Sequence, residues 1–154
     1  MDAPFRIRPA TPADVPAVVA IEGASFSDPW SAQDFRECIA AKVAALVAVR
    51  GTEVAGYVVA HAAADEGEIL NLAVGAGHQR RGLARALVRD ALVELAARGA
   101  RTVYLEVRES NVAARRLYEG LGFVVHARRA NYYRRPVESA LVLKAAIPAG
   151  EPYA

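Results

Sequence analysis

Residues 68–98 read EILNLAVGAGHQRRGLARALVRDALVELAAR, and this stretch decides the fold that the sequence predicts. An apolar, strand-like run at 68–74 leads through a glycine-containing loop into a helical pattern over residues 81–98. The apolar side chains of that pattern recur at helical spacing: Leu83, Leu87, Ala91, Leu92 and Leu95. Gly99 ends the pattern, as glycine commonly ends helices. A strand that enters a strong helix through a short loop is typical of α/β proteins.

Shorter patterns on both sides of this stretch predict the rest of one mixed α/β domain. Two short helices are expected after Thr11 and Ser31, which are both good N-cap residues. The remaining strands are expected at 5–10, 44–50, 54–62, 102–110, 123–130 and 139–147, with a further helix at 111–121. This order predicts a mixed central β-sheet, first a meander and then βαβ crossovers, flanked by helices. We expect a single domain at residues 1–147, followed by a flexible tail at 148–154.

The composition is that of a soluble globular protein, with 54% apolar and 23% charged residues. Its 19 basic and 17 acidic side chains give a net charge of +2, too small a surplus to suggest direct nucleic-acid binding. His61, His78 and His126 lack the spacing of metal ligands, so no metal site is expected. There is a single cysteine, Cys38, and residues 1–16 carry four prolines and do not resemble a signal peptide. Because no apolar run reaches about 18 residues, we expect a cytoplasmic protein without a membrane anchor.

The loop at residues 78–85, HQRRGLAR, has the chemistry of an anion site. Unpaired backbone N–H groups and the dipole at a helix start attract phosphate, and Gly82 allows a close approach. Three arginines add positive charge: Arg80, Arg81 and Arg85. Two common nucleotide motifs fail, because Arg80 replaces a required glycine of G-x-G-x-x-G and no G-K-[ST] is present. From the loop alone, a basic helix start whose arginines face water remains the alternative.

Residues 79–84, QRRGLA, fit the Q/R-x-x-G-x-G/A pattern of the GCN5-related N-acetyltransferases (GNAT), whose loop holds the pyrophosphate of acetyl-CoA. The chain resembles this family over almost its whole length, and most of all the RimI type, the ribosomal-protein alanine N-acetyltransferases. Further matching stretches follow in the family's order: 28–31, 70–74, 105–108 with 110–111, 117–123 and 128–133. The resemblance implies the GNAT fold, acetyl-CoA as the acetyl donor, and direct transfer without an acyl-enzyme.

The resemblance also implies roles for individual residues. Glu106 matches the general base of the RimI type, Tyr118 matches its general acid, and Asn111 matches an asparagine that hydrogen-bonds the pantetheine arm. Backbone groups that hold the acetyl and pantetheine portion match Leu72, Ala73 and Val74. The groups that hold the pyrophosphate match Arg80, Arg81, Gly82, Leu83, Ala84 and Arg85.

The residues themselves leave these roles open. In VYLEVR, residues 103–108, Glu106 lies on the strand face opposite the apolar side chains, where a surface glutamate paired with an arginine is the more common case. Asn111 has the alternative of a helix N-cap, and Tyr118 that of a core aromatic. The chemistry nonetheless suits acetyl transfer. An amine must be neutral to attack a thioester, so a carboxylate can serve as the base and a tyrosine hydroxyl can protonate the leaving thiolate.

Trp30, Tyr132 and Tyr133 are candidate contacts for an acceptor peptide, with packing at the sheet edge as the alternative. The expected partners are acetyl-CoA and a protein N-terminus, and the expected function is acetylation of the N-terminal alanine of a small-subunit ribosomal protein. Acetylation of lysine side chains or of small-molecule amines is one alternative. A non-catalytic CoA-binding module is another, against which the presence of both Glu106 and Tyr118 argues.

Overall fold

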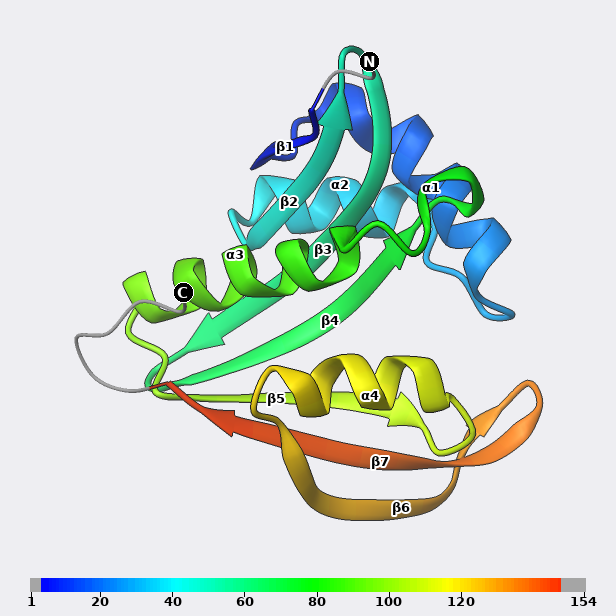
Figure 1. Ribbon diagram of the computed structural model, residues 1–154, viewed down its shortest axis with the longest axis vertical. Helices are drawn as coiled ribbons and strands as arrows, with labels where there is room; N and C mark the ends of the chain where they lie inside the picture. Colours follow the sequence, from blue (N-terminus) through cyan, green and yellow to red (C-terminus); the bar gives the residue numbers. More distant parts are fainter. Residues whose placement is uncertain (1–3, 148–154) are drawn as a thin grey trace.

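In the computed structural model, which describes residues 4–147, the chain forms one seven-stranded sheet flanked by helices (Figure 1). The strands are β1 (Arg6–Pro9), β2 (Ala44–Arg50), β3 (Glu53–Ala63), β4 (Glu66–Val74), β5 (Thr102–Arg108), β6 (Val124–Arg134) and β7 (Val137–Ala146). The helices are α1 (Val15–Ser25), α2 (Ala32–Ala40), α3 (Leu83–Ala97) and α4 (Val112–Gly120), with short 3₁₀ turns η1 (Pro12–Asp14) and η2 (Ala76–His78). The tail expected at 148–154 lies outside the described residues.

The sheet has the strand order β1-β2-β3-β4-β5-β7-β6. β1 to β4 form an antiparallel meander, and β4 and β5 form a parallel pair joined through α3. β7 is inserted between β5 and β6 and is antiparallel to both, so the crossover through α4 passes over one strand. The expected architecture, a meander followed by βαβ crossovers, is confirmed.

Two helix ends illustrate how local chemistry sets the bounds of the elements. At the start of α2, the Asp34 backbone N–H donates to Ser31 Oγ at 3.2 Å, and the Ser31 N–H donates to Asp34 Oδ2 at 2.8 Å. This reciprocal pair is a capping box, which satisfies two backbone donors at a helix start. Gly99 follows α3 with φ +98°, a left-handed conformation that glycine adopts without strain.

β6 is longer than the sequence predicts, and the expected strand end at residue 130 is wrong. The strand passes a register irregularity, where Asn131 has φ +52°, and then resumes its pairing with β7. Tyr133 pairs with Glu138, and Arg134 pairs with Val137. Tyr132 and Tyr133 therefore lie within a hairpin strand, because the ladder is restored after the irregularity.

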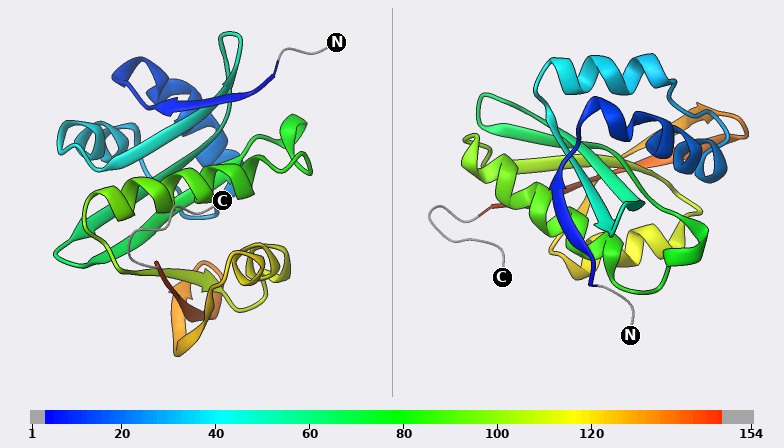
Figure 2. Two further views of the ribbon diagram at one scale, coloured as in Figure 1. Left: turned by 60° about the vertical axis from the view of Figure 1, so that its left-hand side comes forward. Right: turned by 90° about the horizontal axis from the view of Figure 1, so that it is seen from above.

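The sheet separates two layers of helices (Figure 2). On one face, Leu87, Leu92 and Leu95 of α3 are completely buried in a core that α4 also joins. On the other face, Phe35 of α2 packs edge-on against Tyr57 of β3, with ring centroids 5.6 Å apart. Each such fully buried apolar side chain contributes about 2 kcal/mol to folding. The two cores join the sheet to the helices on both of its faces.

β4 and β5 are paired at only one end. Residues Glu66–Ile69 of β4 pair with Thr102–Leu105 of β5. The register between β3 and β4 then shifts by one residue and leaves Leu70 unpaired. A bulge of this kind bends its strand and increases the local twist. Beyond it, β4 and β5 diverge, and a wedge opens in the middle of the sheet (Figure 1).

Candidate active site

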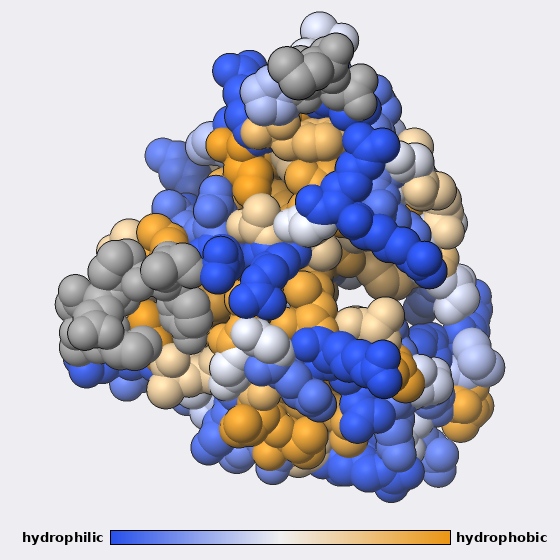
Figure 3. All heavy atoms as spheres, viewed as in Figure 1, coloured by the Kyte–Doolittle hydropathy of each residue, from blue (hydrophilic) through white to orange (hydrophobic). Residues whose placement is uncertain are grey.

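The wedge between β4 and β5 is where the predicted site residues gather. Glu106 lies on β5, Tyr118 on α4, and residues 72–74 on β4. Figure 3 shows an opening through the molecule at this place, with β4 on one side and β5 and α4 on the other. Within the described residues, β4 has no strand partner on its β5 side beyond Ile69. Backbone groups on that edge are therefore available to a ligand.

The loop between β4 and α3 leaves the start of α3 without a side-chain cap. Gly82 is the N-cap residue with φ +77°, and no side chain of the described chain accepts a hydrogen bond there. Arg80 also has a positive φ, +64°, so the chain turns sharply before the helix begins. The helix begins at Leu83, two residues later than expected. The first backbone N–H groups of α3 thus keep the anion-binding capacity of an open helix start.

The first half of this loop, after β4, is hydrogen-bonded to the sheet. The Gly75 N–H donates to the Ala55 carbonyl at 2.7 Å, and Gln79 Nε2 donates to the Val74 carbonyl at 3.2 Å. Arg85 lies close to the end of α4, since a Cβ on Gly120 would meet its Nη1 at 3.2 Å. The start of α3 is therefore held beside α4, at the wedge. Its role as a phosphate site stays a prediction.

Glu106 projects from the β5 face opposite the buried residues Val103, Leu105 and Val107, as the alternation predicts. Its side chain is 25% exposed, and its Oε1 lies 3.6 Å from Nη1 of Arg129 on β6. Glu106 thus has features of both interpretations: it is partly buried, as a general base would be, and it lies beside an arginine, as in a surface ion pair. Sequence reasoning had not singled out Arg129, which appeared only as part of the matching stretch at 128–133.

Two tyrosines of β6 surround Glu106. Hydrogen bonding to Glu106 is the main cause that raises the pKa of Tyr132, which is 43% exposed. Burial, followed by the charge of Glu106, raises the pKa of Tyr133 to about 12. The Arg129 guanidinium lies 5.4 Å from the Tyr132 ring centroid, and that of Arg108 lies 4.2 Å from the Tyr133 centroid. The structure thus brings both candidate acceptor contacts to Glu106.

Tyr118 and Asn111 lie at opposite ends of α4. Tyr118 is 7% exposed and packs edge-on against Phe123, so it is a core aromatic. Burial raises its pKa, with a smaller effect from Tyr133, so its hydroxyl stays protonated and able to donate. Asn111 is the N-cap of α4, and its Oδ1 accepts from the Ala114 N–H at 3.1 Å. The N-cap interpretation is confirmed, and the Asn111 amide nitrogen stays available for a ligand.

The α1–α2 loop and the β6–β7 hairpin meet through a hydrogen bond from Ser27 Oγ to the Arg135 carbonyl. Arg108 of β5 also holds this hairpin, since its Nη2 and Nη1 donate to the carbonyls of Arg135 and Pro136, both at 3.0 Å. Trp30, the third candidate acceptor contact, belongs to the α1–α2 loop. Its ring lies 5.3 Å from that of Phe35, so it also packs against the core. These two segments bound the open side of the wedge.

A groove continues from Glu106 along the same face of the sheet. Its lining includes Glu66 and Glu68 of β4, with His61 of β3 opposite Glu68. Burial, and then the charge of Glu106, raises the pKa of Glu68. Sequence reasoning missed this second carboxylate, although its position two residues from Glu66 on one strand face was readable.

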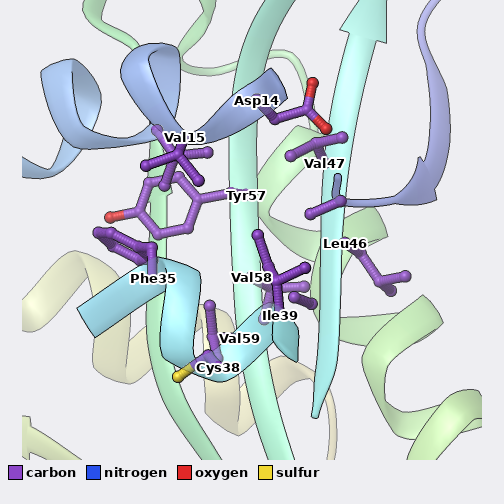
Figure 4. Close-up of a pocket in the computed structure, with 13 residues that line it drawn as sticks. Asp14, Val15, Phe35, Cys38, Ile39, Leu46, Val47, Tyr57, Val58 and Val59 are labelled. Atoms are coloured by element: carbon purple, nitrogen blue, oxygen red, sulfur yellow. The ribbon is translucent and has the colours of Figure 1, made fainter. Parts of the chain in front are cut away.

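A separate apolar pocket lies inside the core between α1, α2 and the sheet (Figure 4). In Figure 4, Phe35 and Cys38 of α2 lie against Tyr57 and Val59 of β3. This pocket shares no lining residue with the groove at Glu106. Burial, with smaller effects from two acidic neighbours, raises the pKa of the Cys38 thiol. Little of it is thiolate at neutral pH, so Cys38 is a poor nucleophile.

Neither a helix suited to cross a membrane nor a cluster of metal ligands is present in residues 4–147. None of the helices there has the length and apolar character needed to cross a membrane. No group of three or more histidine, cysteine, aspartate or glutamate side chains in that range is arranged to hold a metal ion.

Comparisons with known proteins show the family and the fold. A model of the acetyltransferase (GNAT) family matches residues 15–123. The ribosomal protein bS18-alanine N-acetyltransferase of Escherichia coli (strain K12) is 38% identical over 120 residues, which cover 78% of this chain and 81% of that relative. The crystal structure of the ribosomal-protein-S18-alanine N-acetyltransferase from Escherichia coli has a TM-score of 0.87 at 34% identity, covering 96% and 97% of the two chains. Arabidopsis thaliana NAA60 in complex with acetyl-CoA shares the fold, with a TM-score of 0.84 at 21% identity over 94% and 100%.

Proposed function

The chain belongs to the acetyltransferase (GNAT) family, and from this premise we propose that it transfers the acetyl group of acetyl-CoA to the N-terminal α-amine of a protein. One observation carries the proposal, namely the wedge between β4 and β5. An uncapped helix start borders it, Glu106 and Tyr118 lie on its β5–α4 side, and an opening passes through it. Such an arrangement suits two substrates that approach from opposite faces of the sheet.

For the acceptor we propose the N-terminal alanine of a small-subunit ribosomal protein. The support is the 38% identity to the bS18-alanine N-acetyltransferase over 78% of this chain. The α1–α2 loop and the β6–β7 hairpin offer Trp30, Tyr132 and Tyr133 as aromatic surfaces for an extended peptide. The position of Tyr132 and Tyr133 near Glu106 supports the proposal that the peptide's first residue binds there.

Acetyl-CoA is the proposed donor, and the residues of the wedge suit its parts. The pyrophosphate binds the backbone N–H groups at residues 80–85, with the arginines as helpers. The pantetheine arm runs along the free edge of residues 72–74, where a strand-like ligand finds unpaired backbone groups. The Asn111 amide nitrogen donates to the same arm, while its oxygen holds the start of α4.

The proposed mechanism uses two side chains. Glu106 accepts a proton from the acceptor ammonium, directly or through water, which leaves a neutral amine. The amine nitrogen bonds to the thioester carbon, and collapse of the tetrahedral intermediate breaks the C–S bond. Tyr118 protonates the departing thiolate and recovers a proton, through solvent, from the nitrogen that has become an amide. One proton is released to solvent for each acetyl group transferred, and Cys38 takes no part.

A panel of acceptors tests this function. Purified protein and labelled acetyl-CoA are mixed with a peptide that begins with alanine, a lysine peptide whose α-amine is blocked, or spermidine. We expect rapid labelling of the alanine peptide only. Labelling of spermidine or of the blocked peptide alone would contradict the proposed acceptor, and binding of acetyl-CoA with no transfer at all would contradict an enzymatic role.

A further inference from the structure

Glu22 of α1 is a deeply buried carboxylate that the mechanism does not use. Its side chain is 1% exposed and accepts four hydrogen bonds. Asn71 Nδ2 donates to both carboxylate oxygens, at 3.0 and 2.9 Å, and the Trp30 backbone N–H donates to Oε2 at 2.9 Å. The fourth bond comes from the Tyr57 hydroxyl. The carboxylate thus has two hydrogen bonds on each oxygen.

All of these donors are neutral. Asp14, the other buried acidic residue on this side, is instead paired with Arg8, whose Nη1 lies 2.8 Å from Asp14 Oδ2. Burial of a carboxylate with neutral partners is expensive, and apolar replacements of buried charges are often as stable or more stable. The four hydrogen bonds offset part of this cost, and they also fix the positions of their donors.

Two of the donors come from different parts of the proposed site, one from the strand that borders acetyl-CoA and one from the loop that borders the acceptor. Asn71 is the first residue after the Leu70 bulge and directly precedes residues 72–74, the proposed pantetheine edge. Trp30 belongs to the segment 26–31 between α1 and α2, hereafter the acceptor loop. One carboxylate thus joins the acceptor loop to the strand that borders the cofactor.

We propose that Glu22 is a positioning residue that fixes the acceptor loop on β4 and thereby sets the affinity for the acceptor. This inference rests on the proposed function for its kinetic part. None of the four hydrogen bonds reaches the loop before α3 or α3 itself. Loss of the carboxylate therefore loosens the acceptor side, while the pyrophosphate side keeps its geometry.

Glu22→Gln is the direct test, because it keeps the shape and replaces one acceptor oxygen by an NH₂ group that faces other donors. We expect the KM for an alanine-starting peptide to rise about tenfold, equivalent to about 1.4 kcal/mol. The KM for acetyl-CoA should change by less than about twofold, since residues 72–74 stay paired with β3 and no hydrogen bond of Glu22 reaches the proposed phosphate site. Val18→Ala, one turn earlier on the same buried face of α1, is the matched control for simple loss of packing.

Trp30 supplies a readout that needs no activity, because it is the single tryptophan of the chain. Acrylamide should quench its fluorescence more strongly in Glu22→Gln than in the wild type or in Val18→Ala. The exchange Glu22→Gln with Asn71→Asp puts the carboxylate on the strand and the amide on the helix. In this double variant, the KM for the acceptor peptide and the acrylamide quenching of Trp30 should return close to the wild-type values.

Two results would overturn the inference. One is a lower melting temperature in Glu22→Gln with unchanged acceptor KM and unchanged quenching. The other is an equal rise of KM and quenching in Val18→Ala, which would reduce Glu22 to general packing. If the wild type acetylates no peptide, the proposed function fails, whereas the quenching of Trp30 still decides whether Glu22 holds the loop.

Discussion

Replacement of Gly82 by glutamate should weaken acetyl-CoA binding without unfolding the protein. Gly82 has φ +77°, and a Cβ built on it meets no atom within 4 Å. The folding cost of a side chain there is thus backbone strain alone, about 1–2 kcal/mol. Because the backbone is equally strained in the free and the bound protein, this strain by itself leaves the affinity unchanged.

The charge of the new side chain acts on binding. It stands at the uncapped start of α3, where we propose that the pyrophosphate binds. Two like charges 4 Å apart repel by about 1 kcal/mol in bulk water and by about 4 kcal/mol near a protein surface. For this exposed loop we take an intermediate repulsion of about 2 kcal/mol, which raises the dissociation constant for CoA about thirtyfold.

Calorimetric titration with CoA measures the effect against two matched variants. Gly82→Ala carries the strain and the added Cβ without the charge, so the further loss of affinity in Gly82→Glu reports the charge. Gly51→Glu adds a charge at another positive-φ glycine, φ +62° with no atom within 4 Å, in the turn between β2 and β3, and should bind normally. If Gly82→Glu binds CoA as tightly as Gly82→Ala does, the assignment of this loop to the phosphates is wrong.

Three further predictions concern the catalytic acid, a helix cap and a buried ion pair. Tyr118→Phe should lower kcat by about 100-fold with little change in the KM for acetyl-CoA. Because burial raises the pKa of Tyr118, ionisation of this tyrosine should not lower the wild-type rate up to about pH 10. A decline in rate at lower alkaline pH would count against Tyr118 as the acid. Asn111→Ala removes the cap on the Ala114 N–H and should reduce the free energy of unfolding by about 1 kcal/mol in urea denaturation, whereas an unchanged midpoint would mean that the cap contributes nothing. Hydrogen bonding to Arg8 lowers the pKa of Asp14 in the folded protein. Asp14 therefore stabilises the wild type fully above its unfolded pKa of about 3.9, and this contribution is lost as the pH falls through the lower folded pKa. Asp14→Asn should be about 2 kcal/mol less stable than the wild type at neutral pH, with a difference in stability that narrows in acid; a difference independent of pH would contradict the pairing.

The fold was predictable where one local signal dominated. The helical spacing of Leu87 and Leu95 identifies α3, because the helix buries one continuous face. The apolar run at 68–74 identifies β4, because its side chains join the cores on both faces of the sheet. The bulge at Leu70 left no such signal, since it arises from the pairing of β3 with β4 and not from either strand alone. The extension of β6 to Arg134 was hidden for the same reason, because pairing with β7 restores the strand after Asn131.

The site residues were predictable from patterns within one element, but the contacts between elements were not. Alternation in β5 identified the face that carries Glu106, and the position before a helix identified Asn111 as a cap. The approach of Arg129 and Tyr133 to Glu106 depends on a neighbouring hairpin, which spacing within β5 does not reveal. Glu22 did leave a readable signal, since it continues the buried positions of α1 at helical spacing, where an acidic residue requires partners.

The position of the label within one peptide distinguishes acetylation of the α-amine from acetylation of a lysine. The peptide begins with alanine and contains one internal lysine, and tandem mass spectrometry locates the acetyl group after reaction with isotopically labelled acetyl-CoA. We predict labelling of the α-amine by the wild type, and labelling about 100-fold slower by Glu106→Gln at unchanged CoA affinity. A label on the lysine, or an equal rate in Glu106→Gln, would contradict N-terminal acetylation with Glu106 as the base.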